Sequence, residues 1–98
     1  MASREITTSA EEIFLRNLHR KSFVVQNESS TATVFIKKER TVTPTVSSTD
    51  HDHRIGPGGS IALNFGTDGI EAIQDRWTII AASGTPRVSF FETEEVVR

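Results

Sequence analysis

The sequence predicts an all-β protein, a small antiparallel β-sandwich or jelly-roll-like barrel of about six to eight short strands. Short runs rich in Val, Ile, Phe and Thr recur along the chain, separated by Gly, Pro, Ser and Asn clusters at intervals of roughly 8–12 residues. The apolar share is 36% and the charged share 24%, which suits two sheets that each keep one wet face. With 98 residues, we expect a single domain over 1–98 whose modest core needs no disulfides or metals.

The beginning of the chain allows two alternatives. Residues 1–10 have no clear pattern and are predicted to form an N-terminal arm. Residues 8–12 (TSAEE) match a capping box ahead of the apolar run IFL, which favours a short helix. The same region can be read as a strand over 11–16, although Ala, Glu, Leu and Arg are better helix formers. The residues by themselves leave both alternatives open.

A β-hairpin is predicted from the runs 22–27 (SFVVQN) and 32–38 (ATVFIKK), which a short polar segment separates. In the second run, Val34 and Ile36 share one face while Phe35 and Lys37 share the other. Because both faces carry an apolar residue, this strand is expected to be central in its sheet.

The segment 39–54 is rich in Thr and Ser, contains Pro44 and has almost no large apolar side chain. We expect an exposed, irregular loop, with a short edge strand over 41–43. Including the glycine turn that follows, the variable loop spans 39–59. Loops of about 15 residues in small domains are usually functional or mobile, so this segment is a predicted contact surface.

The second half of the chain is predicted to consist of a turn, a strand and a hairpin. The GPGG turn at 56–59 needs a positive φ angle and lacks the residues of a phosphate-binding loop. The strand 60–65 then places its apolar residues on one face. A second hairpin is expected over 76–93 around the turn SGTP, followed by a charged tail at 94–98. Alternation is predicted to put Ile61, Leu63 and Phe65 on one face of their strand, Trp77, Ile79 and Ala81 on one face of the next, and Val88 and Phe90 on one face of the last.

Charge and composition restrict the partners. The net charge of −2 argues against a non-specific grip on nucleic acid or on an anionic membrane. The chain has no cysteine, which excludes thiolate metal and redox sites. It also has neither an apolar signal-peptide core nor a run long enough to span a membrane. We therefore expect a protein made in a cytoplasm, with no membrane and no nucleic-acid partner.

No sequence motif marks a nucleophile with its base, a carboxylate pair or a complete metal site, so neither an enzyme nor a cofactor is expected. His51 and His53 are the single pair with ligand chemistry, because residues i and i+2 of an extended segment point the same way. Two ligands make a weak site unless several chains share it around a symmetry axis. The alternative, which we favour, is a solvated loop tip.

Two further features can be read as binding sites. The segment RNLHRK is basic and can meet an acidic surface, or it can simply be solvated. Trp77, beside Arg76, can form a stacking platform for a sugar or a base, or it can belong to the core or to an interface.

The segments AEEIFLRNLHRKSFVVQNESSTATVFIKK, RIGPGGSIAL and TIIAASGTPRVSFFE together resemble a family of small β-sandwich virion proteins of tailed bacteriophages. The likeness lies in the order of turns and strands over nearly the whole chain, and it implies a strand at 11–15. This chain departs from the family in the loop 39–54 and in Leu18, where the family often has proline. The residues that match the family outline are Asn17, Arg20, Gln26, Asn27, Phe35, Ile36, Gly58, Gly59, Ala82, Gly84 and Val88.

The resemblance implies a structural protein on the capsid surface of the virion, assembled in the host cytoplasm. It would decorate and cement the head by binding the major capsid protein, as a homo-oligomer and preferably a trimer. A tail or head–tail accessory protein is the first alternative. A module that binds host glycans through Trp77 is the second. The residues expected at the interfaces are Arg16, His19, Arg20, Lys21, Thr41, Val42, Thr43, Pro44, Val46 and Trp77.

Overall fold

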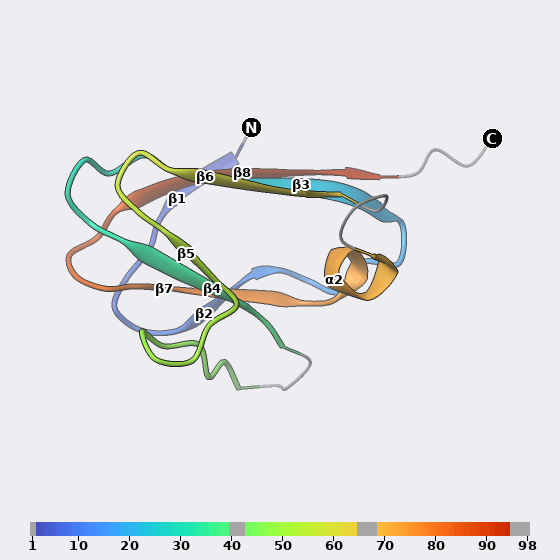
Figure 1. Cartoon of the computed structure of the whole chain (residues 1–98), viewed down its shortest axis with the longest axis horizontal. Coiled ribbons are helices and arrows are strands. Elements are labelled where there is room, and N and C mark those ends of the chain that lie inside the picture. The colour runs from blue at the N-terminus through green and yellow to red at the C-terminus, as the bar shows by residue number, and fades with distance from the viewer. Residues whose placement is uncertain (1, 40–42, 65–68, 95–98) are drawn as a thin grey trace.

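The computed structural model describes residues 2–39, 43–64 and 69–94. These residues form two four-stranded antiparallel sheets that face each other, with one short helix at one end (Figure 1). The prediction of a small antiparallel β-sandwich is therefore confirmed. The elements are β1 (Ala2–Glu5), β2 (Glu11–Phe14), β3 (Arg20–Asn27), β4 (Val34–Lys38), β5 (His53–Ile55), β6 (Ser60–Asn64), α2 (Ile70–Gln74), β7 (Trp77–Ala81) and β8 (Arg87–Glu94).

The strand order is that of a jelly roll. Sheet A has the order β1-β8-β3-β6, and sheet B has the order β2-β7-β4-β5. The first strand pairs with the eighth, the second with the seventh, the third with the sixth and the fourth with the fifth. The chain is thus folded in half into one long antiparallel ribbon, which wraps around to form the two facing sheets.

The two predicted hairpins are wrong, although most of their strands are in the expected places. β3 pairs with β6 and β8, whereas β4 pairs with β5 and β7 in the other sheet. β7 and β8 are likewise divided between the sheets. Facing sheets lie about 10 Å apart, which the residues between Asn27 and Val34 span easily. The sequence of a polar turn between two β-strands is therefore similar whether the turn joins neighbouring strands of one sheet or connects strands of two facing sheets.

Alternation along the strands builds the core. Val34, Ile36, Trp77, Ile79 and Ala81 from sheet B face Phe23, Val25, Leu63 and Val88 from sheet A in one buried cluster. The predicted grouping of residues by face agrees with the core: of the residues expected to share a face, Leu63, Trp77, Ile79, Ala81 and Val88 are buried, and Ile61 and Phe90 are partly buried at the margin. Phe14, Phe23, Phe90 and Trp77 make edge or tilted ring contacts at centroid distances of 4.8–5.7 Å.

The N-terminal region differs from the predicted arm. Residues 2–5 form β1, which pairs with β8 at the edge of sheet A. The ambiguous segment that follows is a strand and not a helix, because β2 hydrogen-bonds to β7 in sheet B. A register shift between Glu12 and Phe14 accompanies the burial of two successive residues, Ile13 and Phe14.

The long loop contains one strand that was not predicted, since residues 53–55 form β5 at the edge of sheet B. Thr41 and Val42, which belong to the predicted edge strand, lie outside the described residues, as do Phe65 and residues 95–98 of the tail. Within the described ranges, no helix has the length and apolar character needed to cross a membrane.

Candidate functional site

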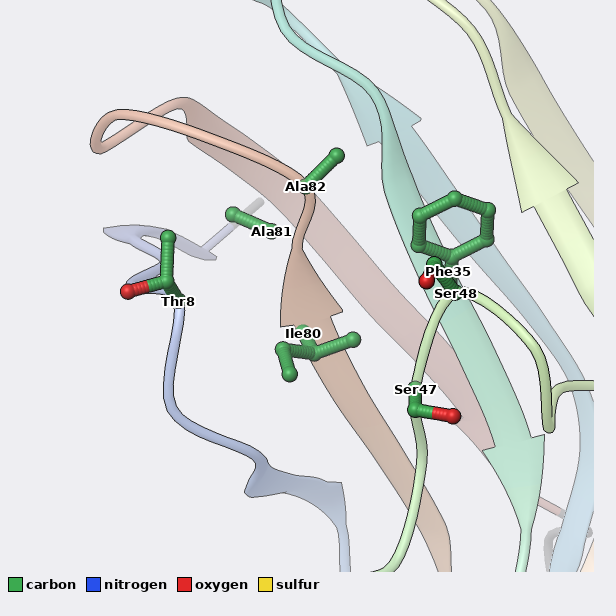
Figure 2. A pocket seen from close by; sticks show the side chains of 7 residues that line it. All are labelled: Thr8, Phe35, Ser47, Ser48, Ile80, Ala81 and Ala82. Atoms are coloured by element: carbon green, nitrogen blue, oxygen red, sulfur yellow. The ribbon is translucent and has the colours of Figure 1, made fainter.

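A hollow of about 220 Å³ opens on the outer face of sheet B. Figure 2 shows β7 between the β1–β2 connection, which carries Thr8, and the loop with Ser47 and Ser48. The floor is apolar and the rim carries hydroxyl groups. We call this site the Phe35–Ile80 hollow, and its lining residues are Thr8, Phe35, Ser47, Ser48, Ile80, Ala81 and Ala82.

The pairing of β4 with β7 brings together the two large apolar residues that form the floor of the hollow. Phe35 stands between the core residues Val34 and Ile36, so its ring points to the outer face of sheet B. Ile80 lies directly opposite Phe35 in the β4–β7 pairing. Thr8 is brought to the rim because the preceding Thr7 accepts a 2.9 Å backbone hydrogen bond from the Ala81 amide.

A buried carboxylate at the end of β4 fastens the loop that forms the other wall. Glu39 is 6% exposed, and it accepts hydrogen bonds from the Thr45 amide, the Thr45 hydroxyl and the Thr78 hydroxyl. Burial raises the pKa of Glu39, but these hydrogen bonds and the charge of Lys37, 4.0 Å away, more than offset it and leave the pKa below its ordinary value. The loop is thus anchored to an ionised side chain.

Two further contacts hold the same loop along β4. Lys37 Nζ lies 2.7 Å from the Asp50 carboxylate and donates to the Thr45 hydroxyl at 3.0 Å. The hydrogen bond with Asp50 is the main reason that the pKa of Lys37 is raised. The Asp52 carboxylate accepts a 2.7 Å hydrogen bond from the Lys38 amide. The predicted irregular loop is therefore irregular in backbone but fastened to sheet B.

The two candidate metal ligands point to different surroundings. The His51 ring lies 4.5 Å from the Phe35 ring, on the outer face of sheet B, and its Nδ1 is 3.1 Å from the Ser47 carbonyl oxygen. The His53 ring stacks 6.0 Å from Trp77, which belongs to the core cluster. The imidazoles do not converge, because the His51 ring packs on the outer face of sheet B whereas the His53 ring packs against the core residue Trp77. Among the described residues, no group of three or more His, Cys, Asp or Glu side chains is placed to hold a metal ion.

The basic segment is divided by burial. Arg16, His19 and Lys21 are exposed and remain candidates for an interface. Arg20 is 1% exposed, so in this fold it cannot offer its side chain to a partner. Instead its guanidinium donates to the carbonyls of Leu15, Ile73 and Asp75, and pairs with Glu92.

Four other predicted interface residues are also placed by the structure. Val46 is 3% exposed and Trp77 is 2% exposed, so neither lies on the surface. The Trp77 indole donates a 2.8 Å hydrogen bond to the Ala72 carbonyl within the fold, which removes it as a stacking platform for a sugar. Thr43 is exposed and Pro44 is half-buried.

The sequence does not predict the hollow, although one of its patterns is consistent with an apolar site on an outer face. The strand at 32–38 carries an apolar residue on both faces, and β7 also places Ile80 on its outer face. Apolar residues on the outer face of a two-layer sandwich indicate that something covers that face. Here the loop containing Ser47 covers part of it and leaves the hollow beside it.

The chemistry of the hollow is that of a binding site. None of its lining residues carries an ionisable side chain, so it holds neither a general base nor an electrostatic clamp for a transition state. An apolar floor with a hydroxyl rim fits a neutral, compact apolar group.

Comparisons of the chain with protein families, with curated protein sequences and with solved structures find no significant match. The class that can be stated is therefore the architecture, a single jelly-roll β-sandwich.

Proposed function

We propose that this protein is a structural virion protein of a tailed bacteriophage, a capsid decoration protein that binds the major capsid lattice and stabilises the head. The resemblance of the sequence to small virion accessory proteins suggests the role. Jelly rolls are common in viral capsid proteins, but they also occur in lectins and in other unrelated proteins. The fold alone therefore does not support a capsid role, and the structural support comes from one surface of the protein.

The observation that carries the proposal is the outer face of sheet A. Val24, at its centre, lies opposite Phe91 on β8 and Ala62 on β6. Phe91 is 39% exposed. The neighbours around this centre are uncharged, namely Ser22, Gln26, Ser60, Asn64, Ser89 and Thr93, and the Arg87–Glu5 ion pair lies at one end of the face. We call this surface the Phe91 face.

A broad face of small, uncharged side chains suits contact with another protein. Charged residues are depleted at the cores of protein interfaces and aromatic residues are enriched there, so Phe91 and Val24 form the centre of the contact and the surrounding Ser, Asn, Gln and Thr side chains form its polar rim. Small side chains also leave the sheet flat, so that a partner can approach over a wide area. We propose that the Phe91 face lies against the major capsid protein, where many copies stabilise the shell together.

The proposal is tested with capsids assembled from the major capsid protein of the same genome. The purified protein is expected to cosediment with them, and electron microscopy should place it at threefold or quasi-threefold positions. Phe91→Asp, which puts a charge at the centre of the face, should abolish cosedimentation. Thr49→Asp, a matched change at an exposed loop residue, should not.

Electron-microscopy density for the protein that is confined to the tail of the virion would contradict capsid decoration and favour the tail or head–tail alternative. Cosedimentation that Phe91→Asp leaves unchanged would show that another surface binds the capsid.

A further inference from the structure

Two apolar surface features lie towards opposite ends of β7. One is the Phe35–Ile80 hollow, beside the end of the strand. The other is the β2–β3 loop, which carries Leu15 and Leu18 with 70% and 58% of their surface exposed. These are the most exposed large apolar side chains in the described part of the chain. Single exposed leucines are ordinary, but a pair on one short loop indicates an interaction site.

The loop with the two leucines is held firmly through its backbone. The buried guanidinium of Arg20 donates to the Leu15 carbonyl, and the Gln74 side-chain amide donates to the Leu18 carbonyl at 2.7 Å. Between them, the Asn17 amide donates to the Gln74 carbonyl at 2.9 Å. Because the backbone is already ordered, presenting the leucines to a partner costs little conformational entropy.

The leucines of one molecule lie far from its own hollow. The β2–β3 loop passes beside α2 (Figure 1). β2 runs antiparallel to β7 with Phe14 opposite Trp77, so Leu15 lies beyond the beginning of β7. The hollow begins three residues further along, at Ile80, which is roughly 10 Å of extended strand. Only a second molecule can bring the two features together without unfolding the loop.

The charges around the two features are complementary. Exposed Arg16 and Lys21 flank the leucines, where Glu94 accepts a hydrogen bond from the Asn17 side chain, so basic groups are in excess there. Exposed Asp50 and Asp52 lie on the loop that walls the hollow, where Lys37 pairs with Asp50 and leaves Asp52 as the acidic excess. Opposite charges around an apolar centre steer the approach of two surfaces and favour one orientation.

We propose that Leu15 and Leu18 of one copy insert into the Phe35–Ile80 hollow of a second copy. The contact joins two different surfaces, so each molecule in the assembly both gives and receives leucines. Repetition of such a contact closes into a ring when the rotation between copies allows it. This inference identifies the partner of the hollow and concerns the protein alone, so it stands or falls independently of the proposed role on the capsid.

Sedimentation velocity of the full chain over a range of concentrations tests the proposal. The wild-type protein is expected to self-associate. The double change Leu15→Ser and Leu18→Ser should raise the dissociation constant at least about tenfold, because two buried leucine side chains are lost. Ala82→Trp should do the same by filling the hollow, and it alters an exposed residue outside the core.

A mixing experiment distinguishes this contact from any symmetric one. The double leucine variant keeps its hollow, and the Ala82→Trp variant keeps its leucines. Together they should form a 1:1 complex and nothing larger, although each alone is monomeric. The control Phe91→Ser removes an exposed apolar side chain from the other sheet and should leave self-association unchanged.

A wild-type chain that stays monomeric at all concentrations would overturn the proposal. So would unchanged association of the leucine variant, or a mixture in which the two variants do not combine. Circular dichroism of each variant establishes that it is folded. If Ala82→Trp does not fold, Ser48→Trp on the opposite wall of the hollow takes its place.

Discussion

The guanidinium carbon of Arg20 lies 5.0 Å from the centre of the Phe14 ring, and both side chains are buried. The same guanidinium donates to three backbone carbonyls, those of Leu15, Ile73 and Asp75. One side chain thus joins β3 to the β2–β3 loop and to α2, and it also orders the loop that carries the exposed leucines.

Arg20→Ala is expected to lower the free energy of unfolding by about 3–5 kcal/mol, because it leaves buried carbonyls unpaired and removes the partner of Glu92. The free energy of unfolding of Arg20→Lys should lie between those of Arg20→Ala and the wild type, since one ammonium group cannot reach all of these acceptors. Urea denaturation measures both. The control Arg16→Ala, at an exposed position, should change stability by less than about 0.5 kcal/mol. A loss below about 1 kcal/mol for Arg20→Ala would contradict this role.

Asn27 connects two loops at the other end of the sandwich. Its side-chain amide is fully buried and donates to the carbonyls of Ala32, Ile55 and Gly56 at 2.7–3.2 Å. Asn27→Asp keeps the shape of the side chain but replaces the donating amide group with an oxygen that faces the three carbonyl oxygens. We therefore expect the free energy of unfolding to fall by about 3 kcal/mol or more. Gln26→Glu, the same chemical change at the exposed neighbouring residue, should have little effect. Equal losses for the two variants in urea would contradict the assignment.

Glu39 predicts a dependence of stability on pH. Its pKa is lowered in the folded protein from the ordinary 4.5. Its ionised form therefore contributes stability above pH 4.5, and this contribution is lost as the pH falls through the lower pKa of the folded state. The difference in unfolding free energy between the wild type and Glu39→Gln should narrow steadily below pH 4.5. Thr78→Val, which removes one donor to Glu39, should weaken this dependence. A difference that stays constant from pH 7 to pH 3 would refute it.

Gly58 occupies the turn before β6 with a φ angle of +71°. A Cβ atom at this position would meet no atom within 4 Å, so the cost of Gly58→Ala is purely conformational, about 1–2 kcal/mol. Gly56→Ala, in the same turn, has no such backbone strain and only an ordinary 3.8 Å contact with Arg54. Thermal unfolding should separate the two variants, and equal melting temperatures would argue against the turn geometry.

The pattern of residues predicts where most strands lie and which residues of each strand share a face. Alternation is a local property with a period of two, so it groups Val34 with Ile36 and Trp77 with Ile79 on one face of their strands. Both faces of these strands carry apolar residues, so the packing of the sheets decides which face is buried. The helix or strand choice at residues 11–14 was different, because local propensity favoured helix. Hydrogen bonds to β7 make this segment a strand. From the sequence, only the family resemblance favoured a strand here.

The candidate site was harder to predict, because burial of polar and aromatic groups depends on distant partners. The sequence places Arg20 in a basic turn that is expected to be solvated, but in the fold the carbonyls of Leu15, Ile73 and Asp75 and the rings of Phe14 and Phe23 surround it. Trp77 looked available for stacking, but it is enclosed by Phe23 and His53.

The sequence by itself determined an all-β single domain, the main strands and which residues of a strand share a face, because these follow from composition and from alternation over a few residues. The tertiary structure decided which strands pair, since a turn carries no record of whether it joins neighbours or crosses between sheets. It also decided the surfaces. The Phe35–Ile80 hollow and the Phe91 face each gather residues from segments far apart in the chain, and only the wrapping of the jelly roll brings those segments together.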